Sequence, residues 1–174
     1  MKKLFFLWVA IVSMGLASCN ESELEIDDLN TRPYIHDLFI AFEDEAGNNL
    51  AVGMSSPKDT NIVNENDYNL YVTVRGGSRY PVYKLKYKTI NGKRYLDFSR
   101  VLLNHYVESI TFEFICKHIF GNTTRHQIEA QYEASDVEVI RPCVGFEFDG
   151  TYYPAGPDGT VTIKLCETDS DGKG

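Results

Sequence analysis

The strongest constraint on the fold is a strict alternation of apolar and polar residues around Asn91-Gly92, in the segment VYKLKYKTINGKRYLDFS (residues 82–99). Asn-Gly is preferred in two-residue type I′ hairpin turns, because both central positions of that turn require a positive φ. Such a loop pairs Ile90 with Lys93 and fixes the register of both strands. The predicted cross-strand pairs, on one apolar and one polar face, are Tyr87–Leu96, Leu85–Phe98, Lys88–Tyr95 and Lys86–Asp97.

Three further segments alternate in the same way and are expected to form strands. Residues 109–120 (SITFEFICKHIF) and 126–133 (HQIEAQYE) each present one apolar face, and the loop 121–123 is expected to join them as a hairpin. The segment 144–154 (VGFEFDGTYYP) contains a second turn signal, Asp149-Gly150. Its two-residue loop predicts the pairs Phe148–Thr151, Glu147–Tyr152 and Phe146–Tyr153.

The remaining alternating segments bring the expected number of strands to about nine. They are HDLFIAF (36–42), NNLAVGM (48–54), YNLYVTVR (68–75) and TVTIKLC (160–166). Residues 99–108 could form a short helix or a long loop, and the spacing of their apolar residues does not decide between these. Short strands separated by turn residues, without an amphipathic helix, favour a sandwich or barrel. We expect an all-β, antiparallel immunoglobulin-like β-sandwich in a single domain over residues 34–167.

The N-terminus reads as an export signal. Lys2 and Lys3 precede an apolar run over residues 4–16, which is long enough for a secretion signal and too short for a membrane span. The run ends in Leu-Ala-Ser-Cys, in which small residues fit the signal peptidase and the thiol of Cys19 can receive a diacylglycerol. We therefore expect residues 1–18 to be a lipoprotein signal peptide and Cys19 the lipid attachment site. An ordinary secretion signal is the alternative.

Residues 19–33 follow this cysteine as an acidic segment (ESELEIDD within it) without apolar periodicity, which is typical of a flexible tether. Residues 168–174 are expected to be a flexible tail. The lipobox and the acidic stretch resemble those of surface-exposed lipoproteins of the Bacteroidota, many of which are small β-sandwich proteins. The resemblance implies a protein that is lipid-anchored in the outer membrane and faces the cell exterior. It implies no particular activity.

Charge excludes one class of partner. Loss of Lys2 and Lys3 with the signal lowers the 17 basic side chains to 15, against 25 acidic ones, so the mature net charge is about −10. A surface of this sign repels phosphate backbones, so we expect no nucleic-acid partner. About 150 mature residues suit one domain with its own core.

Three cysteines besides Cys19 bear on the redox state. No Cys-x-x-Cys spacing is present, which argues against a zinc knuckle or a thioredoxin-like site. A disulfide can form outside the cytoplasm, and Cys116–Cys143 is the favoured pair because both flank strand segments. The odd third cysteine, Cys166, leaves at least one thiol without a partner inside the chain. Three buried reduced cysteines are the alternative.

The sequence offers few groups for catalysis or metal binding. No Gly-x-Ser-x-Gly elbow or phosphate-binding Gly-rich loop occurs. Cys116 and His118 share a strand face and are interpreted as core residues. If the loop 121–123 has three residues, His118 lies opposite His126, and two imidazoles could bind a transition metal with a third ligand. Acidic turns at 43–48 and 169–172 are weak calcium candidates. We expect no cofactor and assign no metal ligand.

Exposed tyrosines are the best candidates for a ligand surface, because flat aromatic rings stack on sugar rings beside carboxylates and amides. The mature chain retains no Trp, but Tyr152 beside Glu147 is the leading candidate, followed by Tyr80 and Tyr95. Tyrosines also cover half-buried sheet faces without binding anything.

The sequence thus favours a non-enzymatic surface lipoprotein that binds or scaffolds an envelope protein, a host component or a glycan. The alternative is a glycan-binding accessory of a polysaccharide uptake system. A hydrolase would need two carboxylates brought together at glycosidase separation by the fold.

Overall fold

Alternating side chains produce strands along nearly the whole described chain. The computed structural model describes residues 33–74, 77–103, 107–133 and 140–165. The elements are β1 (Pro33–Asp37), β2 (Phe39–Glu43), β3 (Asn69–Val74), β4 (Arg79–Pro81), β5 (Lys86–Ile90), β6 (Lys93–Asp97), β7 (Arg100–Leu103), β8 (Ser109–Ile115), a helical turn α2 (Lys117–Phe120), β9 (His126–Tyr132), β10 (Ile140–Phe148), β11 (Thr151–Pro154) and β12 (Thr160–Lys164).

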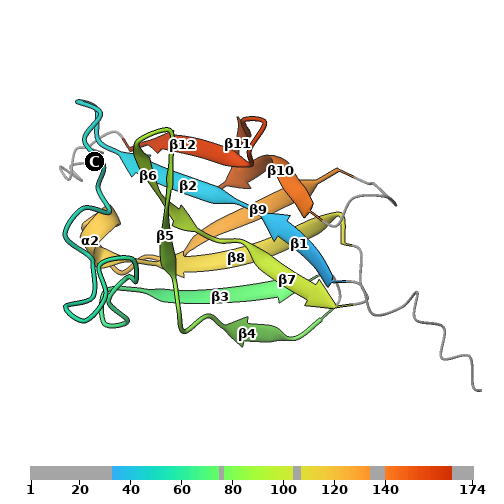
Figure 1. Cartoon of the computed structure of the whole chain (residues 1–174), viewed down its shortest axis with the longest axis horizontal. Coiled ribbons are helices and arrows are strands. Elements are labelled where there is room, and N and C mark those ends of the chain that lie inside the picture. The colour runs from blue at the N-terminus through green and yellow to red at the C-terminus, as the bar shows by residue number, and fades with distance from the viewer. Residues whose placement is uncertain (1–32, 75–76, 104–106, 134–139, 166–174) are drawn as a thin grey trace, which may run out of the picture. The chain divides into compact units, whose positions relative to one another are not determined.

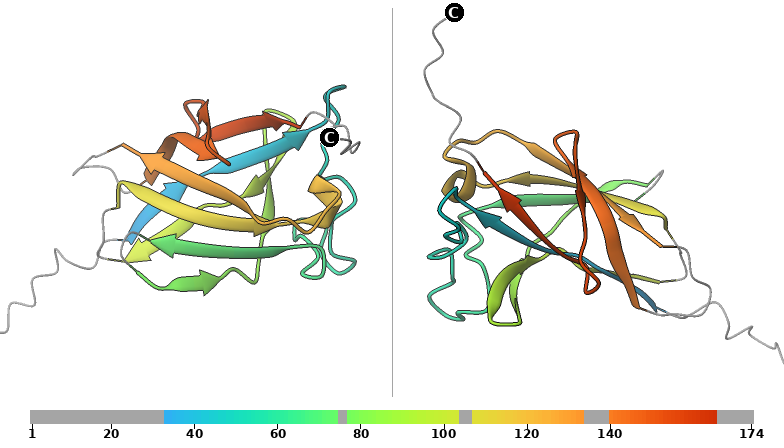
Figure 2. Two further views of the ribbon diagram at one scale, coloured as in Figure 1. Left: turned by 180° about the vertical axis from the view of Figure 1, so that it is seen from behind. Right: turned by 90° about the horizontal axis from the view of Figure 1, so that it is seen from above.

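Two sheets face each other in a sandwich-like arrangement (Figures 1 and 2). The large sheet has the order β4-β3-β8-β9-β10-β1-β7, and β11 pairs with β10 beside this path. The small sheet has the order β12-β2-β6-β5. The expectation of a β-sandwich is therefore confirmed at the level of two packed β-sheets.

One corner of the sandwich is made by strands that pass from one sheet to the other. The segment β1–β2 bends at Leu38, and β6–β7 bends beside it at Phe98 and Ser99. β1 pairs with β7 in the large sheet, and β2 pairs with β6 in the small one. At the bend the Phe98 N–H donates to the Leu38 carbonyl (2.9 Å), and the Leu38 N–H donates to the Ser99 hydroxyl (3.3 Å). The ribbon is thereby continuous between the sheets.

The expectation of a purely antiparallel sandwich is wrong in two places. β1 runs parallel to β10, and β2 runs parallel to β12. Both parallel partners belong to the C-terminal part of the chain, which lies beside each half of the bent β1–β2 segment. Such pairings depend on how distant segments pack, and alternation within a strand carries no information about them.

Both hairpins specified by turn residues form as predicted. Asn91 and Gly92 have φ values of 51° and 79°, and Asp149 and Gly150 have values of 47° and 83°. The registers agree with seven expected pairs: Ile90–Lys93, Lys88–Tyr95, Tyr87–Leu96, Lys86–Asp97, Phe148–Thr151, Glu147–Tyr152 and Phe146–Tyr153. The expected pair Leu85–Phe98 lies beyond the end of the ladder, because the Leu85 N–H donates to the Tyr68 hydroxyl and the Phe98 N–H to the Leu38 carbonyl.

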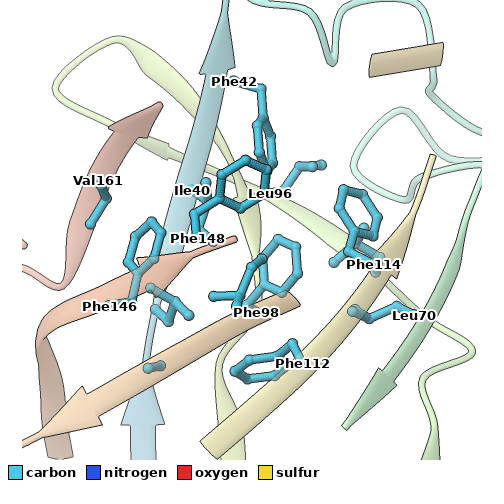
Figure 3. Packing of buried hydrophobic residues seen from close by; sticks show 14 of the residues in the cluster. Ile40, Phe42, Leu70, Leu96, Phe98, Phe112, Phe114, Phe146, Phe148 and Val161 are labelled. Carbon is cyan, nitrogen blue, oxygen red and sulfur yellow. The ribbon is translucent and has the colours of Figure 1, made fainter. Parts of the chain in front are cut away.

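The core lies between the sheets and is rich in phenylalanine (Figure 3). Phe98, at the strand bend, packs edge-on against Phe112 and Phe114 of β8, at 5.5 and 5.4 Å between ring centroids. Phe42 of β2 approaches Phe114 at 5.9 Å. All four rings are almost completely buried, so the core draws on both sheets and on the corner that joins them.

Two local predictions are wrong, and part of the undecided segment forms a strand. The strand expected over 109–120 ends at Ile115, because Lys117–Phe120 forms a helical turn that Gly121 closes with a φ of 72°. Phe120 can then pack edge-on against Phe42 at 5.4 Å. Residues 48–54 form turns with only an isolated bridge to β2, whereas residues 100–103 of the undecided segment form β7.

The favoured disulfide does not form, because Cys116 and Cys143 lie far apart in the large sheet. β9 separates β8 from β10, and Cys116 lies beyond the end of β9 that carries His126, whereas Cys143 pairs with Tyr132 at its other end. A disulfide requires Cα atoms about 4.4–6.8 Å apart. Both residues are buried free thiols, and burial raises the pKa of Cys143 to about 11.

The signal, the tether, Cys19, Cys166 and the C-terminal tail lie outside the described residues. Within the described ranges, no helix has the length and apolar character needed to cross a lipid bilayer.

Candidate functional site

A surface groove lies at the β3–β4 end of the large sheet. Its volume is about 430 Å³, within the range of small-ligand sites. The lining combines three tyrosines with amides, one carboxylate and apolar side chains: Glu65, Asn66, Tyr68, Asn69, Leu70, Tyr71, Pro81, Val82 and Tyr83.

Antiparallel pairing of β3 with β4 brings the two walls of the groove together. Tyr71 pairs with Pro81, and the Val82 N–H donates to the Leu70 carbonyl at 2.8 Å, which carries the same register one step further. Tyr83 therefore lies beside Asn69, on the sheet face that Tyr71 and Pro81 also share.

The loop before β3 supplies the third wall and is held by its own hydrogen bonds. The Asn64 side chain accepts from the Asn66 N–H at 3.2 Å, and the Asn64 carbonyl accepts from the Asp67 N–H at 3.0 Å. Next in the chain, the buried hydroxyl of Tyr68 accepts from the Leu85 N–H at 2.9 Å. Burial raises the pKa of Tyr68. This tyrosine fixes the floor of the groove, whereas Glu65 and Asn66 remain exposed.

Tyr71 is immobilised by charged neighbours on the outer face of the sheet. The Arg79 guanidinium lies 3.5 Å from the centre of the Tyr71 ring and forms an ion pair with Glu113 at 2.8 Å. Arg125 approaches the same carboxylate oxygen at 3.3 Å. One face of Tyr71 is thus covered by a cation, so the ring acts as a rigid wall of the groove.

Tyr83 is the ring best placed to contact a ligand. It is 70% exposed, the highest exposure among the large hydrophobic side chains of the described residues. An open aromatic face beside the amides of Asn66 and Asn69 and the carboxylate of Glu65 provides one stacking surface with several hydrogen-bonding groups. This combination suits a flat, polyhydroxylated ligand.

The tyrosines proposed from sequence do not share one surface. Tyr152 lies opposite Glu147 on the β10–β11 hairpin, as predicted, and is 55% exposed. Its ring covers Gly145, since a Cβ there would lie 2.2 Å from the Tyr152 hydroxyl, so it also has a structural role. Tyr80 is exposed on β4 outside the groove, and Tyr95 lies on β6 in the small sheet.

Sequence reasoning missed the groove residues Tyr71, Tyr83, Asn66 and Asn69. The available signal was the pair of short apolar-polar alternations on either side of residues 75–78, which β3 and β4 occupy. Only their pairing shows that residues separated by more than ten positions line one site.

The two histidines weighed as metal ligands do not face each other. His118 lies in α2, and its Nε2 is 3.0 Å from the Val52 carbonyl. Nδ1 of His126 lies 2.6 Å from Oδ2 of Asp149, and the His126 ring packs on the Phe120 ring with 3.8 Å between their centroids. The arrangement expected from a three-residue loop is therefore wrong. Among the described residues, no three His, Cys, Asp or Glu side chains form a group that could hold a metal ion.

The remaining candidates have structural partners where they are described. Cys116 contacts the sulfur of Met54 at 3.9 Å, so it is not paired with His118. In the acidic turn 43–48, Asp44 accepts from the Asn48 side chain at 2.8 Å and from its backbone N–H at 2.7 Å. These hydrogen bonds lower the pKa of Asp44. The turn 169–172 lies outside the described residues.

Comparison with known proteins adds no assignment: the chain matches no protein-family model, no curated protein and no solved structure.

Proposed function

We propose that the protein is a non-enzymatic, lipid-anchored binding module of the outer membrane, held through Cys19 and facing the cell exterior. The N-terminal sequence supports the anchor, because a charged start, an apolar run and small residues precede that cysteine. The acidic segment after it would carry the sandwich away from the membrane. Membrane lipid and a surface ligand are then its two partners, and nucleic acid is not one.

We further propose that the ligand is a neutral glycan bound in the β3–β4 groove. This proposal depends on one observation, the exposed ring of Tyr83 beside two amides and a carboxylate in a groove of about 430 Å³. Sugar rings stack their apolar faces on aromatic rings and exchange hydrogen bonds with amides and carboxylates. A mature net charge of about −10 disfavours acidic polysaccharides. The groove therefore favours a glycan-binding accessory over a protein scaffold.

We also infer that the sandwich is immunoglobulin-like. The order β4-β3-β8-β9 joins two hairpins through their first strands, as the C′-C-F-G strands of a variable-type sheet do. The bent β1–β2 segment contributes to both sheets, which supports the same classification. An experimental structure in which β3 and β8 are not neighbours would contradict it.

Glycan binding can be tested with an array of neutral and acidic oligosaccharides, followed by calorimetry on the best ligand. Tyr83→Ala removes the stacking ring and is expected to weaken binding about 3- to 10-fold, corresponding to about 0.5–1.5 kcal/mol. Tyr80→Ala is the matched control, because it removes an equally large exposed ring from β4 outside the groove. Absence of binding, or an equal loss in both variants, would contradict the proposal.

Two further measurements address the anchor and the absence of catalysis. Cys19→Ala is expected to release the protein into the soluble fraction, and continued membrane association would contradict lipid attachment. A membrane-impermeant reagent applied to whole cells is expected to label the wild type. Incubation with the bound oligosaccharide should leave its chain length unchanged, and the appearance of shorter products would identify a hydrolase.

A further inference from the structure

Three neighbouring strands place a row of cationic and imidazole side chains inside the sandwich. β1 pairs with β10 on one side and β7 on the other, so His36 lies between Arg141 and Arg100. His36 is completely buried and Arg141 is 2% exposed. The Arg100 guanidinium lies 5.5 Å from the core ring of Phe112, which places it on the inner face as well.

Tyr132 lies next to this row, on β9, which neighbours β10 in the large sheet. Its ring packs edge-on against His36, with 4.8 Å between the centroids. Tyr132 is 4% exposed, so its hydroxyl lies inside the molecule. We call Arg100, His36 and Tyr132 the β7-end cluster.

Several hydrogen-bonding atoms of the β7-end cluster have no partner within the described part of the chain. They are the Tyr132 hydroxyl, Nε and Nη2 of Arg100, and both ring nitrogens of His36, which backbone groups of Tyr34 and Val107 approach without forming a hydrogen bond of normal geometry. Buried polar atoms without partners cost stability, and native proteins contain few of them. At least four of these five atoms can donate a hydrogen bond. They therefore indicate a site for a ligand rich in acceptor oxygens.

The two atoms on Arg100 specify the geometry of that ligand. Nη1 donates to the Ser99 carbonyl at 2.6 Å, which leaves the edge formed by Nε and Nη2. The N–H groups on this edge are parallel and match two oxygens on one carboxylate or phosphate. Among acidic residues, Asp97 has the largest electrostatic effect on Arg100. Oδ1 of Asp97, however, already accepts a hydrogen bond from the Ser99 N–H at 2.9 Å.

The protonation states of the cluster suit an anion. Burial raises the pKa of Tyr132 well above its usual value, so the phenol remains a donor. Burial lowers the pKa of His36, and the charge of Arg141 lowers it further. His36 is then neutral near pH 7 and offers one N–H. Arg100 supplies a permanent positive charge.

We propose that Arg100, His36 and Tyr132 bind a small oxyanion, a carboxylate or a phosphate, inside the sandwich. β7 is the last strand of the large sheet, and Arg100 on it is only partly buried, so the anion enters from this edge. Arg100, His36 and Tyr132 do not line the β3–β4 groove, although Arg100 and the groove residue Tyr68 lie close enough to interact electrostatically.

Thermal unfolding in sodium acetate and in sodium phosphate, each at ionic strength held constant with sodium chloride, tests the proposal. The wild-type midpoint is expected to rise with anion concentration, as ligand binding to the folded state requires. A response to acetate alone identifies a carboxylate, a response to phosphate alone a phosphate, and a response to both a general oxyanion site.

Variants locate the effect. Arg100→Gln is expected to abolish the rise, whereas Arg125→Gln, which removes the same charge from an exposed position, should keep it. Tyr132→Phe removes one hydrogen bond to the anion and should weaken the apparent affinity about tenfold or more. It also keeps the test decisive if Arg100→Gln does not fold. A flat wild-type response, or wild-type slopes in Arg100→Gln or Tyr132→Phe, would overturn the proposal.

Discussion

Acid is expected to destabilise the protein through His36. Burial lowers the pKa of this imidazole and the Arg141 guanidinium adds to the effect, while backbone groups of Tyr34 and Val107 oppose it. The folded-state pKa therefore lies below the value of about 6.5 that the unfolded chain shows. As the pH falls, the unfolded state binds the proton first. The contribution of His36 is fully present above about pH 6.5 and is lost below it.

The size of the effect follows from the single proton involved. A difference of one bound proton changes the free energy of unfolding by at most about 1.4 kcal/mol per pH unit. Between pH 6.5 and pH 5 the loss can therefore reach about 2 kcal/mol. His36 is completely buried between Arg141 and Arg100, so solvent does not screen this term appreciably. A domain of this size has a total stability of about 5–15 kcal/mol, so such a loss is measurable.

Urea unfolding at pH 5, 6, 7 and 8 can isolate this contribution when wild type is compared with His36→Gln. Asp37, whose pKa is raised mainly by burial, titrates in both proteins and cancels in the difference. His118→Gln is the control, because it removes an exposed imidazole whose Nε2 lies 3.0 Å from the Val52 carbonyl. The wild type should lose up to about 2 kcal/mol more than His36→Gln between pH 8 and pH 5. A difference that stays constant with pH would refute the reasoning.

Three further changes test the packing. Phe98→Ala should lower the free energy of unfolding by about 3–5 kcal/mol, because its completely buried ring packs against Phe112 and Phe114 at the corner; urea titration measures this. Gly92→Ala should cost about 1–2 kcal/mol, since the turn holds a φ of 79°, and a smaller loss would mean that the turn can rearrange. Gly145→Ala should cost about 1 kcal/mol in wild type and much less in a Tyr152→Ser background, because the new Cβ collides with that ring. Equal losses in the two backgrounds would contradict the contact.

The sequence was sufficient for features that depend on neighbouring residues. Asn91-Gly92 and Asp149-Gly150 fixed two registers, because few dipeptides accept two consecutive positive φ values. Alternation likewise identified the inward faces of β8 and β9. Alternation failed after Ile115, where the same apolar spacing continued into a helical turn. From that turn Phe120 packs against Phe42 and Phe114, which belong to other parts of the chain.

Features that depend on which strands meet could not be predicted. The two parallel pairings follow from the bend at Leu38, a residue that looks like any other apolar strand position. The groove needs β3 beside β4, and the row of Arg141, His36 and Arg100 needs three strands from separate parts of the chain. Charged residues at such positions read as solvent-exposed in a sequence, because burial of Arg is rare.

Both proposed sites lie where pairing in the large sheet ends, and the physics of sheets explains why. An inner strand such as β8 has neighbours on both sides, so its inward residues pack and its outward residues pair across strands. At the β4 edge, a strand of only three residues leaves the Tyr83 ring in solvent beside an adjacent loop. At the β7 edge, the bend between sheets turns polar side chains inward, where fewer neighbours can satisfy them. Substitutions on the outer face of β9 should therefore leave both sites intact.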